Sequence, residues 1–188
     1  MIPTEQLTIH TVAEQSGPVP SALGWSIGGP KTAADFGFDD APLLDILLLP
    51  GGFGTASELD NPRMMSFLSQ RASEAQITCS VCSGSALLAK AGVLDGHRAT
   101  SNKQLFALAV NQSDKVDWVE SARWVDDGPV VTASGVSAGM DMSLAVIQRL
   151  WGEDVARQTA ELAEYTWHED ADSDPFASGL NKAVAMLG

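Results

Sequence analysis

The amino-acid sequence predicts an α/β fold, a three-layer sandwich in which helices cover both faces of a mainly parallel β-sheet. Three observations favour it. Residues 43–49 form an apolar run, interrupted only by Asp45, that is too short for a helix and is followed by Pro-Gly-Gly, the pattern of a parallel strand buried on both faces. A second β-rich run, residues 77–81, passes directly into a helix-forming stretch at residues 83–91. Strands and helices alternate over most of the chain, which is typical of a parallel sheet.

The other elements follow from residue type and turn signals. Asn61 and Pro62 supply an N-cap and a first-turn proline for a helix that runs to about residue 72. Gly92 ends the helix that begins near residue 83. Asp126-Asp127-Gly128 separates two strand-like runs and predicts a β-hairpin. The remaining predicted strands are residues 7–13, 25–27, 99–101, 116–125 and 129–133, and the remaining predicted helices are residues 102–110, 140–150, 153–165 and 180–187.

Composition narrows the class of protein. The chain has 188 residues, 45% hydrophobic and 19% charged, so we expect one folded domain over residues 1–188. It carries 24 acidic and 11 basic residues, a net charge of −13, and we therefore expect no nucleic acid among its partners. No apolar run approaches the ~20 residues of a membrane span, and no secretory signal is visible. Together with only two cysteines, these features predict a cytoplasmic protein without a membrane partner.

The main chemical signal lies where the strand at residues 77–81 meets the next helix. There Ser80-Val81-Cys82-Ser83-Gly84 has the form small-x-nucleophile-x-Gly. Small residues on both sides allow a nucleophile elbow, the strained turn that exposes a reactive side chain at the carboxyl edge of a sheet. The N-terminus of the following helix favours a thiolate. We therefore expect Cys82 to be a nucleophile.

A nucleophile also needs hydrogen-bond donors for the negative charge that develops on its substrate. The glycines after the strand at residues 43–49 allow close approach of their backbone amides, and the Ser83 amide is the expected second donor. Both cues place the donors in the crevice that holds Cys82.

Other interpretations of the cysteines are less favoured. A free cysteine is most often a buried structural thiol, and we assign that role to Cys79, inside a predicted strand. Cys79 and Cys82 form a C-x-x-C pair, but the first cysteine of a thioredoxin-like pair precedes its helix instead of lying within a strand. A zinc site needs two more ligands, and His10, His97 and His168 show no ligand spacing. We therefore expect no metal.

Two groups of carboxylates receive structural interpretations. Asp141 falls in the predicted first turn of a helix, where a carboxylate interacts favourably with the helix dipole and needs no catalytic role. The acidic run after His168 lacks the glycine-marked geometry of a calcium loop, and we interpret it as a solvated loop. Its members are Glu169, Asp170, Asp172 and Asp174.

These segments together resemble the ThiJ/PfpI superfamily, and within it the isocyanide hydratase-like branch. The resemblance covers nearly the whole chain from about residue 7. It is carried by the Pro-Gly-Gly strand end, the elbow around Cys82 with its helix, the glycine-rich turn at residues 135–141 and the stretch at residues 164–176. It implies a flavodoxin-like fold with Cys82 as nucleophile and the amides of Gly52 and Ser83 as the oxyanion site. It also implies a homodimer, and neither a metal nor an organic cofactor.

Two features depart from the pattern of that superfamily. Members usually begin with a further strand and an Asp or Glu that hydrogen-bonds the nucleophilic cysteine, whereas this chain begins in what resembles the segment after them. We therefore expect the usual first strand and acid to be absent, with another copy of the chain as one candidate to fill the place of the strand. Glu14 is a candidate acid partner, although a solvated turn carboxylate is the commoner role. Asn102 stands where several relatives have a histidine, and an amide cannot act as a base.

The function expected from these residues is a cysteine-dependent hydratase or hydrolase. Its substrate would be a small molecule with an electrophilic carbon, isocyanide-like or ketoaldehyde-like, attacked by Cys82. One alternative is a non-enzymatic redox sensor or stress protein in which Cys82 is oxidised. A second is a ligand-sensing regulatory module, because this fold also forms the sensing half of some transcription regulators. Turnover of a substrate separates the enzyme from both alternatives.

Overall fold

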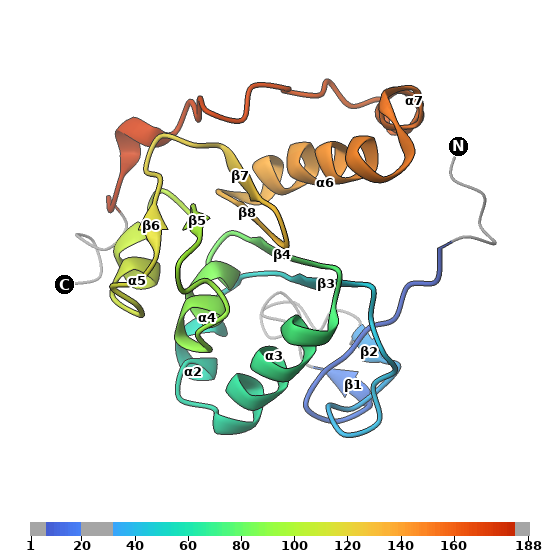
Figure 1. Cartoon of the computed structure of the whole chain (residues 1–188), viewed down its shortest axis with the longest axis vertical. Coiled ribbons are helices and arrows are strands. Elements are labelled where there is room, and N and C mark those ends of the chain that lie inside the picture. The colour runs from blue at the N-terminus through green and yellow to red at the C-terminus, as the bar shows by residue number, and fades with distance from the viewer. Residues whose placement is uncertain (1–6, 20–31, 183–188) are drawn as a thin grey trace.

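The computed structural model describes residues 7–19 and 32–182, and a four-stranded sheet lies at its centre (Figure 1). The order of the strands is β3 (Ile46–Leu49), β4 (Ile77–Val81), β8 (Val130–Ala133) and β7 (Trp124–Asp127). β3, β4 and β8 are parallel, whereas β7 pairs antiparallel with β8. The turn of this hairpin contains Gly128 at φ 74°, a conformation that favours glycine. The predictions of a mainly parallel sheet and of the hairpin are both confirmed.

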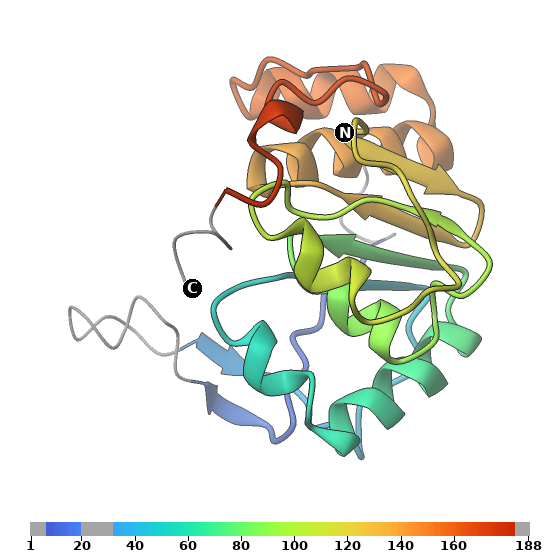
Figure 2. The ribbon, with the colours of Figure 1, turned by 90° about the vertical axis from the view of Figure 1, so that its left-hand side faces the viewer.

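Helices cover both faces of this sheet, as Figure 2 shows. α3 (Pro62–Glu74) and α4 (Gly84–Lys90) lie on one face, and α6 (Val136–Trp151) lies on the other, with α7 (Glu153–Leu162) against α6. Because successive residues of a strand point to opposite faces, Val130 belongs to the hydrophobic cluster under α3 and α4, while Val131 belongs to the cluster under α6. The predicted three-layer α/β sandwich is therefore confirmed.

The shorter elements lie around this framework. They are β1 (Gly17–Val19) and β2 (Thr32–Ala34), which pair antiparallel, α2 (Thr55–Glu58), β5 (Arg98–Ala99) and β6 (Asp117–Trp118), which pair in parallel, α5 (Phe106–Val110) and the 3₁₀ helix η2 (Ala177–Gly179). The predicted strand at residues 25–27 and most of the predicted helix at residues 180–187 lie outside the described residues. Among the described residues, no helix has the length and apolar character needed to cross a membrane.

The beginning of α3 follows the sequence prediction closely. The Asn61 side chain accepts hydrogen bonds from the backbone N–H groups of Arg63 and Met64, and Pro62 occupies the first turn. The helix buries Phe67 and Leu68, and each such side chain contributes roughly 1.5–3 kcal/mol to folding. The cap thus fixes where the helix starts, and its apolar face fixes which side meets the sheet.

Three strand predictions differ from the structure. The predicted strand at residues 116–125 is divided into β6 and the beginning of β7, which belong to different sheets. Residues 7–13 form no regular strand, and Val12 makes only an isolated parallel bridge with Phe36. The apolar run at residues 43–49 forms the shorter strand β3, which pairs with β4 alone among the described strands. On the faces of β3, Leu47 is buried but Leu48 is 51% exposed, so the expectation of a strand buried on both faces is wrong. The apolar run thus predicted the strand but not which of its faces is covered.

Candidate functional site

Cys82 lies on the turn between β4 and α4. Its φ angle is 60°, in the left-handed region that residues other than glycine rarely adopt. The Cys82 N–H donates to the Ala133 carbonyl oxygen at 3.1 Å, and the Cys82 carbonyl oxygen accepts from Ser101 Oγ at 3.3 Å and Ser85 Oγ at 3.2 Å. These contacts hold the strained backbone in place and leave the thiol half-buried at the carboxyl edge of the sheet. The geometry of a nucleophile elbow is therefore present.

Close contact between two backbones requires the glycines on either side of the elbow. A Cβ atom on Gly84 would lie 2.5 Å from the Leu49 carbonyl oxygen, and one on Gly51 would lie 2.5 Å from the Ser83 amide nitrogen. Neither position therefore accommodates a side chain. The end of β3 consequently lies directly against the beginning of α4, which places Gly52 beside Ser83.

The two predicted oxyanion donors, the N–H groups of Gly52 and Ser83, differ in whether they already make a hydrogen bond. The Gly52 N–H donates to Ser83 Oγ at 3.1 Å, and the same hydroxyl lies 2.9 Å from Thr55 Oγ1. The Ser83 N–H has no acceptor among the described residues. The structure thus brings Cys82, Gly52 and Ser83 together, with the Ser83 amide free and the Gly52 amide engaged. Their catalytic roles stay predictions.

Glu14 is engaged at the N-terminus of α3. Its Oε1 lies 3.2 Å from Arg63 Nη1, and its Oε2 accepts from Asn61 Nδ2 at 3.1 Å. The pair is partly exposed, and no contact joins Glu14 to Cys82 within the part of the chain that the structure describes. These contacts do not support Glu14 as an acid partner, and that role stays a prediction.

Cys79 differs from Cys82 because it is fully buried. It lies within β4 and is 1% exposed, which confirms the prediction of a core residue. Burial raises the pKa of the Cys79 thiol to about 12, and the nearby Asp126 carboxylate adds to the shift. The thiol therefore stays protonated at neutral pH, and Cys82 is the cysteine suited to nucleophilic chemistry.

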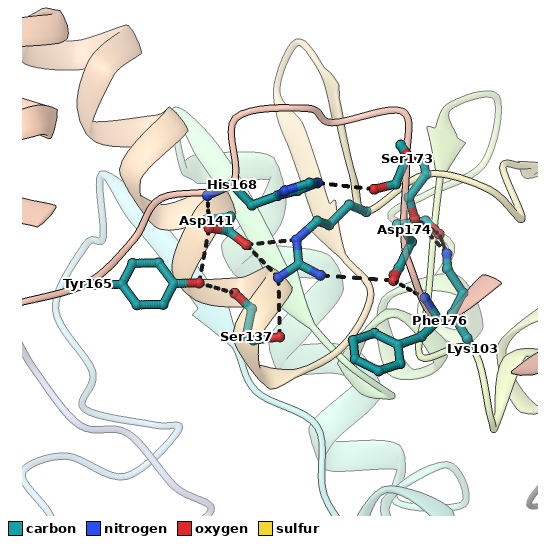
Figure 3. A network of polar contacts seen from close by, with 11 residues as sticks. Lys103, Ser137, Asp141, Tyr165, His168, Ser173, Asp174 and Phe176 are labelled. Carbon is teal, nitrogen blue, oxygen red and sulfur yellow. Dashed lines mark hydrogen bonds and ion pairs between the residues drawn. The ribbon is translucent and has the colours of Figure 1, made fainter.

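A buried polar network joins α6 to the segment that follows α7 (Figure 3). Arg123 Nε donates to Asp141 Oδ2 at 2.7 Å, and Arg123 Nη2 donates to Ser137 Oγ at 3.2 Å. Asp141 Oδ1 accepts from the Tyr165 hydroxyl at 3.0 Å and from the His168 N–H at 2.9 Å. Burial raises the pKa of Tyr165, and the Asp141 carboxylate raises it further.

The structure corrects the interpretation of two carboxylates. Asp141 lies in the second turn of α6 and is fully buried, so it holds a network together instead of interacting with the helix dipole. Asp174 is not a solvated loop residue, because its side chain is 0% exposed. Its Oδ1 accepts from the Phe176 N–H at 2.9 Å, while Oδ2 has no partner among the described residues.

Sequence reasoning did not find the two basic residues at this site. Arg123 lies between Ala122 and Trp124, both buried, just before β7. Lys103 Nζ donates to Thr100 Oγ1 at 2.7 Å and to the Ala122 carbonyl oxygen at 2.6 Å. The sequence did carry a signal for its burial, because Arg123 stands among the apolar residues Ala122, Trp124 and Val125 of a strand-like run. Asn102 Oδ1 accepts from the backbone N–H groups of residues 104 and 105 and forms a turn there.

A cavity of about 390 Å³ lies between residues 102–104, Arg123, residues 134–140 and the segment at residues 174–176. Two of its residues follow directly after residues that bind the Cys82 backbone: Ser134 comes after Ala133, and Asn102 comes after Ser101. The other residues that line it are Lys103, Gln104, Arg123, Gly135, Val136, Ser137, Met140, Asp174 and Phe176. Within residues 7–19 and 32–182, no group of three or more His, Cys, Asp or Glu side chains is placed to hold a metal ion.

Comparison with known proteins finds matches over most of the chain. A sequence model of the DJ-1/PfpI family matches residues 2–149. The isonitrile hydratase of Pseudomonas putida is 32% identical over 176 residues, which cover 91% of this chain and 69% of the hydratase. The HTH-type transcriptional regulator GbdR of Pseudomonas aeruginosa is 29% identical over 141 residues, which cover 75% of this chain and 38% of the regulator. The crystal structure of a ThiJ/PfpI family protein from Pseudomonas syringae is similar with a TM-score of 0.73 at 29% identity, covering 96% of this chain and 72% of that one.

Proposed function

The chain belongs to the DJ-1/PfpI family, and from that premise we propose that it is a cysteine-dependent hydratase that converts small isocyanides into N-substituted formamides. The observation that carries the proposal is the strained backbone of Cys82, at φ 60°, next to the Ser83 N–H, which finds no acceptor in the described part of the chain. This geometry exposes a nucleophile and supplies a donor for developing charge. The similarity to isonitrile hydratase supports the choice of substrate.

The proposed reaction needs water and no other reactant. The Cys82 sulfur bonds to the terminal carbon of R–N≡C, and the thiol proton is transferred to that carbon, which gives the thioimidate R–N=CH–S–Cys82. Water then adds across the C=N bond, with its hydroxyl on carbon and its proton on nitrogen. Loss of the hydroxyl proton and cleavage of the C–S bond release R–NH–CHO, and the sulfur regains a proton.

The backbone amides act on the intermediate that carries oxygen. As the hydroxyl group loses its proton, negative charge develops on oxygen, and the Ser83 N–H donates to it. The Gly52 N–H adds a second hydrogen bond once Ser83 Oγ turns toward Thr55 Oγ1, its other partner. Ser83 thus contributes a donor and controls whether the Gly52 amide is free.

The test is formation of N-cyclohexylformamide from cyclohexyl isocyanide, followed by mass spectrometry in ¹⁸O-labelled water. We expect the label in the product, and at least a hundredfold lower rate in Cys82→Ser, because a serine hydroxyl is a much weaker nucleophile at neutral pH. Cys79→Ala is the matched control, since Cys79 is buried and remote from the reaction, and its rate should stay within about twofold. Absence of labelled formamide with the wild-type chain, or an unchanged rate in Cys82→Ser, would refute the proposal.

The similarity to GbdR favours one second candidate, a ligand-sensing module without turnover. The chain matches 38% of that regulator's length, so this candidate concerns the matching part of such a protein. Binding of a small molecule near Cys82 without any chemical change in it would favour the module over the enzyme.

A further inference from the structure

The cavity of about 390 Å³ has an apolar wall and a polar floor. Val136, Met140 and Phe176 form the wall, and they are 77%, 45% and 62% exposed. Arg123, Lys103 and Asp174, which are all buried, supply charged groups. A small pocket of this kind selects its ligand by shape along the wall and by hydrogen bonds at the floor.

Two polar atoms of the floor lack a hydrogen-bond partner among the described residues. Arg123 Nε and Nη2 are engaged, but Nη1 meets only Asp174 Oδ1, at 3.9 Å, which is too long for a hydrogen bond. Asp174 Oδ2 is buried without any donor. Buried polar groups are nearly always hydrogen-bonded, so the buried Asp174 Oδ2 points to a ligand that presents a donor, and Arg123 Nη1 beside it is available for an acceptor of the same ligand.

The charges of the floor balance one another. The Arg123 guanidinium is paired with the Asp141 carboxylate, and the Lys103 ammonium lies in the field of Asp174. A carboxylate ligand would be repelled by Asp174, and an ammonium ligand would be repelled by Arg123 and Lys103. An uncharged group that both donates and accepts avoids each cost.

We infer that this cavity binds the substituent of the molecule on which Cys82 acts, and that this substituent is an apolar chain bearing an uncharged amide. Its carbonyl oxygen accepts from Arg123 Nη1, its N–H donates to Asp174 Oδ2, and its hydrocarbon part lies along Val136 and Phe176. The assignment of this ligand as substrate rests on the proposed function, whereas the recognition of the amide does not.

Four probes with the same carbon chain test the recognition by calorimetry on the full chain. They are hexanamide, N,N-dimethylhexanamide, hexanoate and hexylamine. We expect hexanamide to bind with a Kd at least tenfold lower than each of the others, because the dimethyl probe lacks the N–H donor and the last two carry a charge. Equal affinity for all four, tighter binding of a charged probe, or no binding of hexanamide would overturn the inference.

Asp174→Asn tests the contact itself. An asparagine keeps the Oδ1 acceptor for the Phe176 N–H and replaces Oδ2 with an N–H₂ donor, so it reverses the polarity of one atom. We expect hexanamide to lose at least tenfold in affinity, with N,N-dimethylhexanamide changed by less than about twofold. Asp170→Asn, an exposed acid in the same segment, is the matched control. Unchanged hexanamide affinity in Asp174→Asn would overturn the inference.

The link to Cys82 has its own readout, which does not depend on turnover. Saturating hexanamide should slow alkylation of Cys82 by iodoacetamide at least threefold in the wild-type chain, because the inferred ligand lies against Ser134 and Asn102, which adjoin the residues that hold the Cys82 backbone. An unchanged rate would overturn the placement of the ligand beside Cys82. Selective binding together with absent isocyanide hydration would refute the proposed function alone.

Discussion

Cys79 and Cys82 show how three positions along the chain change the chemistry of one residue type. Cys79 lies inside β4, where the alternation of side chains directs it into the cluster under α6 and burial raises its pKa to about 12. Cys82 follows directly after the last residue of β4, on a backbone held at φ 60°. The difference between a buried and a half-buried thiol is therefore a consequence of where the strand ends.

Lys103 carries a pH dependence that can be measured on the whole protein. It is 2% exposed, and burial lowers the pKa of its ammonium to about 8, with Asp174 and Glu120 opposing the shift. In the unfolded chain this pKa is near 10.5, so between pH 8 and 10.5 the unfolded state binds more protons than the folded one. The contribution of Lys103 to stability therefore rises with pH across that window.

The measurement is urea unfolding of the wild type and Lys103→Met between pH 7 and 9.5. We expect the difference in free energy of unfolding, wild type minus variant, to change little below about pH 7.5 and to increase by about 2 kcal/mol by pH 9.5. Other groups that titrate in this range, Cys79 among them, are present in both proteins and cancel. A difference that is constant or falls with pH would show that the Lys103 ammonium is not destabilised by burial.

At the scale of elements, the contact between β3 and α4 depends on the absence of a side chain at Gly84. The Gly84 Cβ position lies 2.5 Å from the Leu49 carbonyl oxygen, a backbone atom that cannot move without shifting the end of β3. Because both backbones also position Gly52 and Ser83, any shift at this contact alters the spacing of the two amides beside Cys82.

We therefore expect Gly84→Ala to lower the free energy of unfolding by about 2–3 kcal/mol, as overpacked sites do, and to slow alkylation of Cys82. Gly54→Ala is the matched control. Gly54 caps α2 with φ −71°, and an added Cβ there meets nothing within 4 Å. Thermal unfolding of both variants tests the prediction, and equal melting temperatures would contradict it.

The same scale shows what the sequence could and could not predict. Local signals were sufficient for the cap at Asn61, the hairpin turn at Gly128 and the sharp turn at Cys82, because each depends on residues within a few positions. The prediction of a strand at residues 7–13 was wrong because a strand forms only against a neighbouring strand, and an alternating pattern does not show whether one is present. The burial of Asp174 was missed because its neighbours come from distant segments, and nothing local distinguishes it from the exposed acids before it.

At the scale of the whole molecule, one buried carboxylate joins segments that are far apart in the sequence. Asp141 accepts from Arg123 before β7 and from Tyr165 and His168 after α7, and its carbonyl oxygen accepts from Trp167 Nε1 at 3.2 Å. The segment after α7 has no regular helix or strand up to η2. Its position across α6 and β7, visible in Figure 1, therefore depends strongly on these contacts.

The variant Asp141→Asn removes the negative charge of this side chain and keeps nearly the same shape. An asparagine Oδ1 still accepts from Tyr165 and His168, but the buried Arg123 guanidinium loses its hydrogen-bonded anion and keeps only Asp174, at 3.9 Å. Loss of one partner of a buried ion pair costs about 3–5 kcal/mol, so we expect the free energy of unfolding to fall by roughly that amount. Hydrogen exchange should accelerate over residues 165–176 more than in β4, whereas Asp170→Asn should change stability by less than about 0.5 kcal/mol. A loss below about 1 kcal/mol, or acceleration spread evenly over the chain, would show that packing along α6 rather than the Asp141 carboxylate holds this segment.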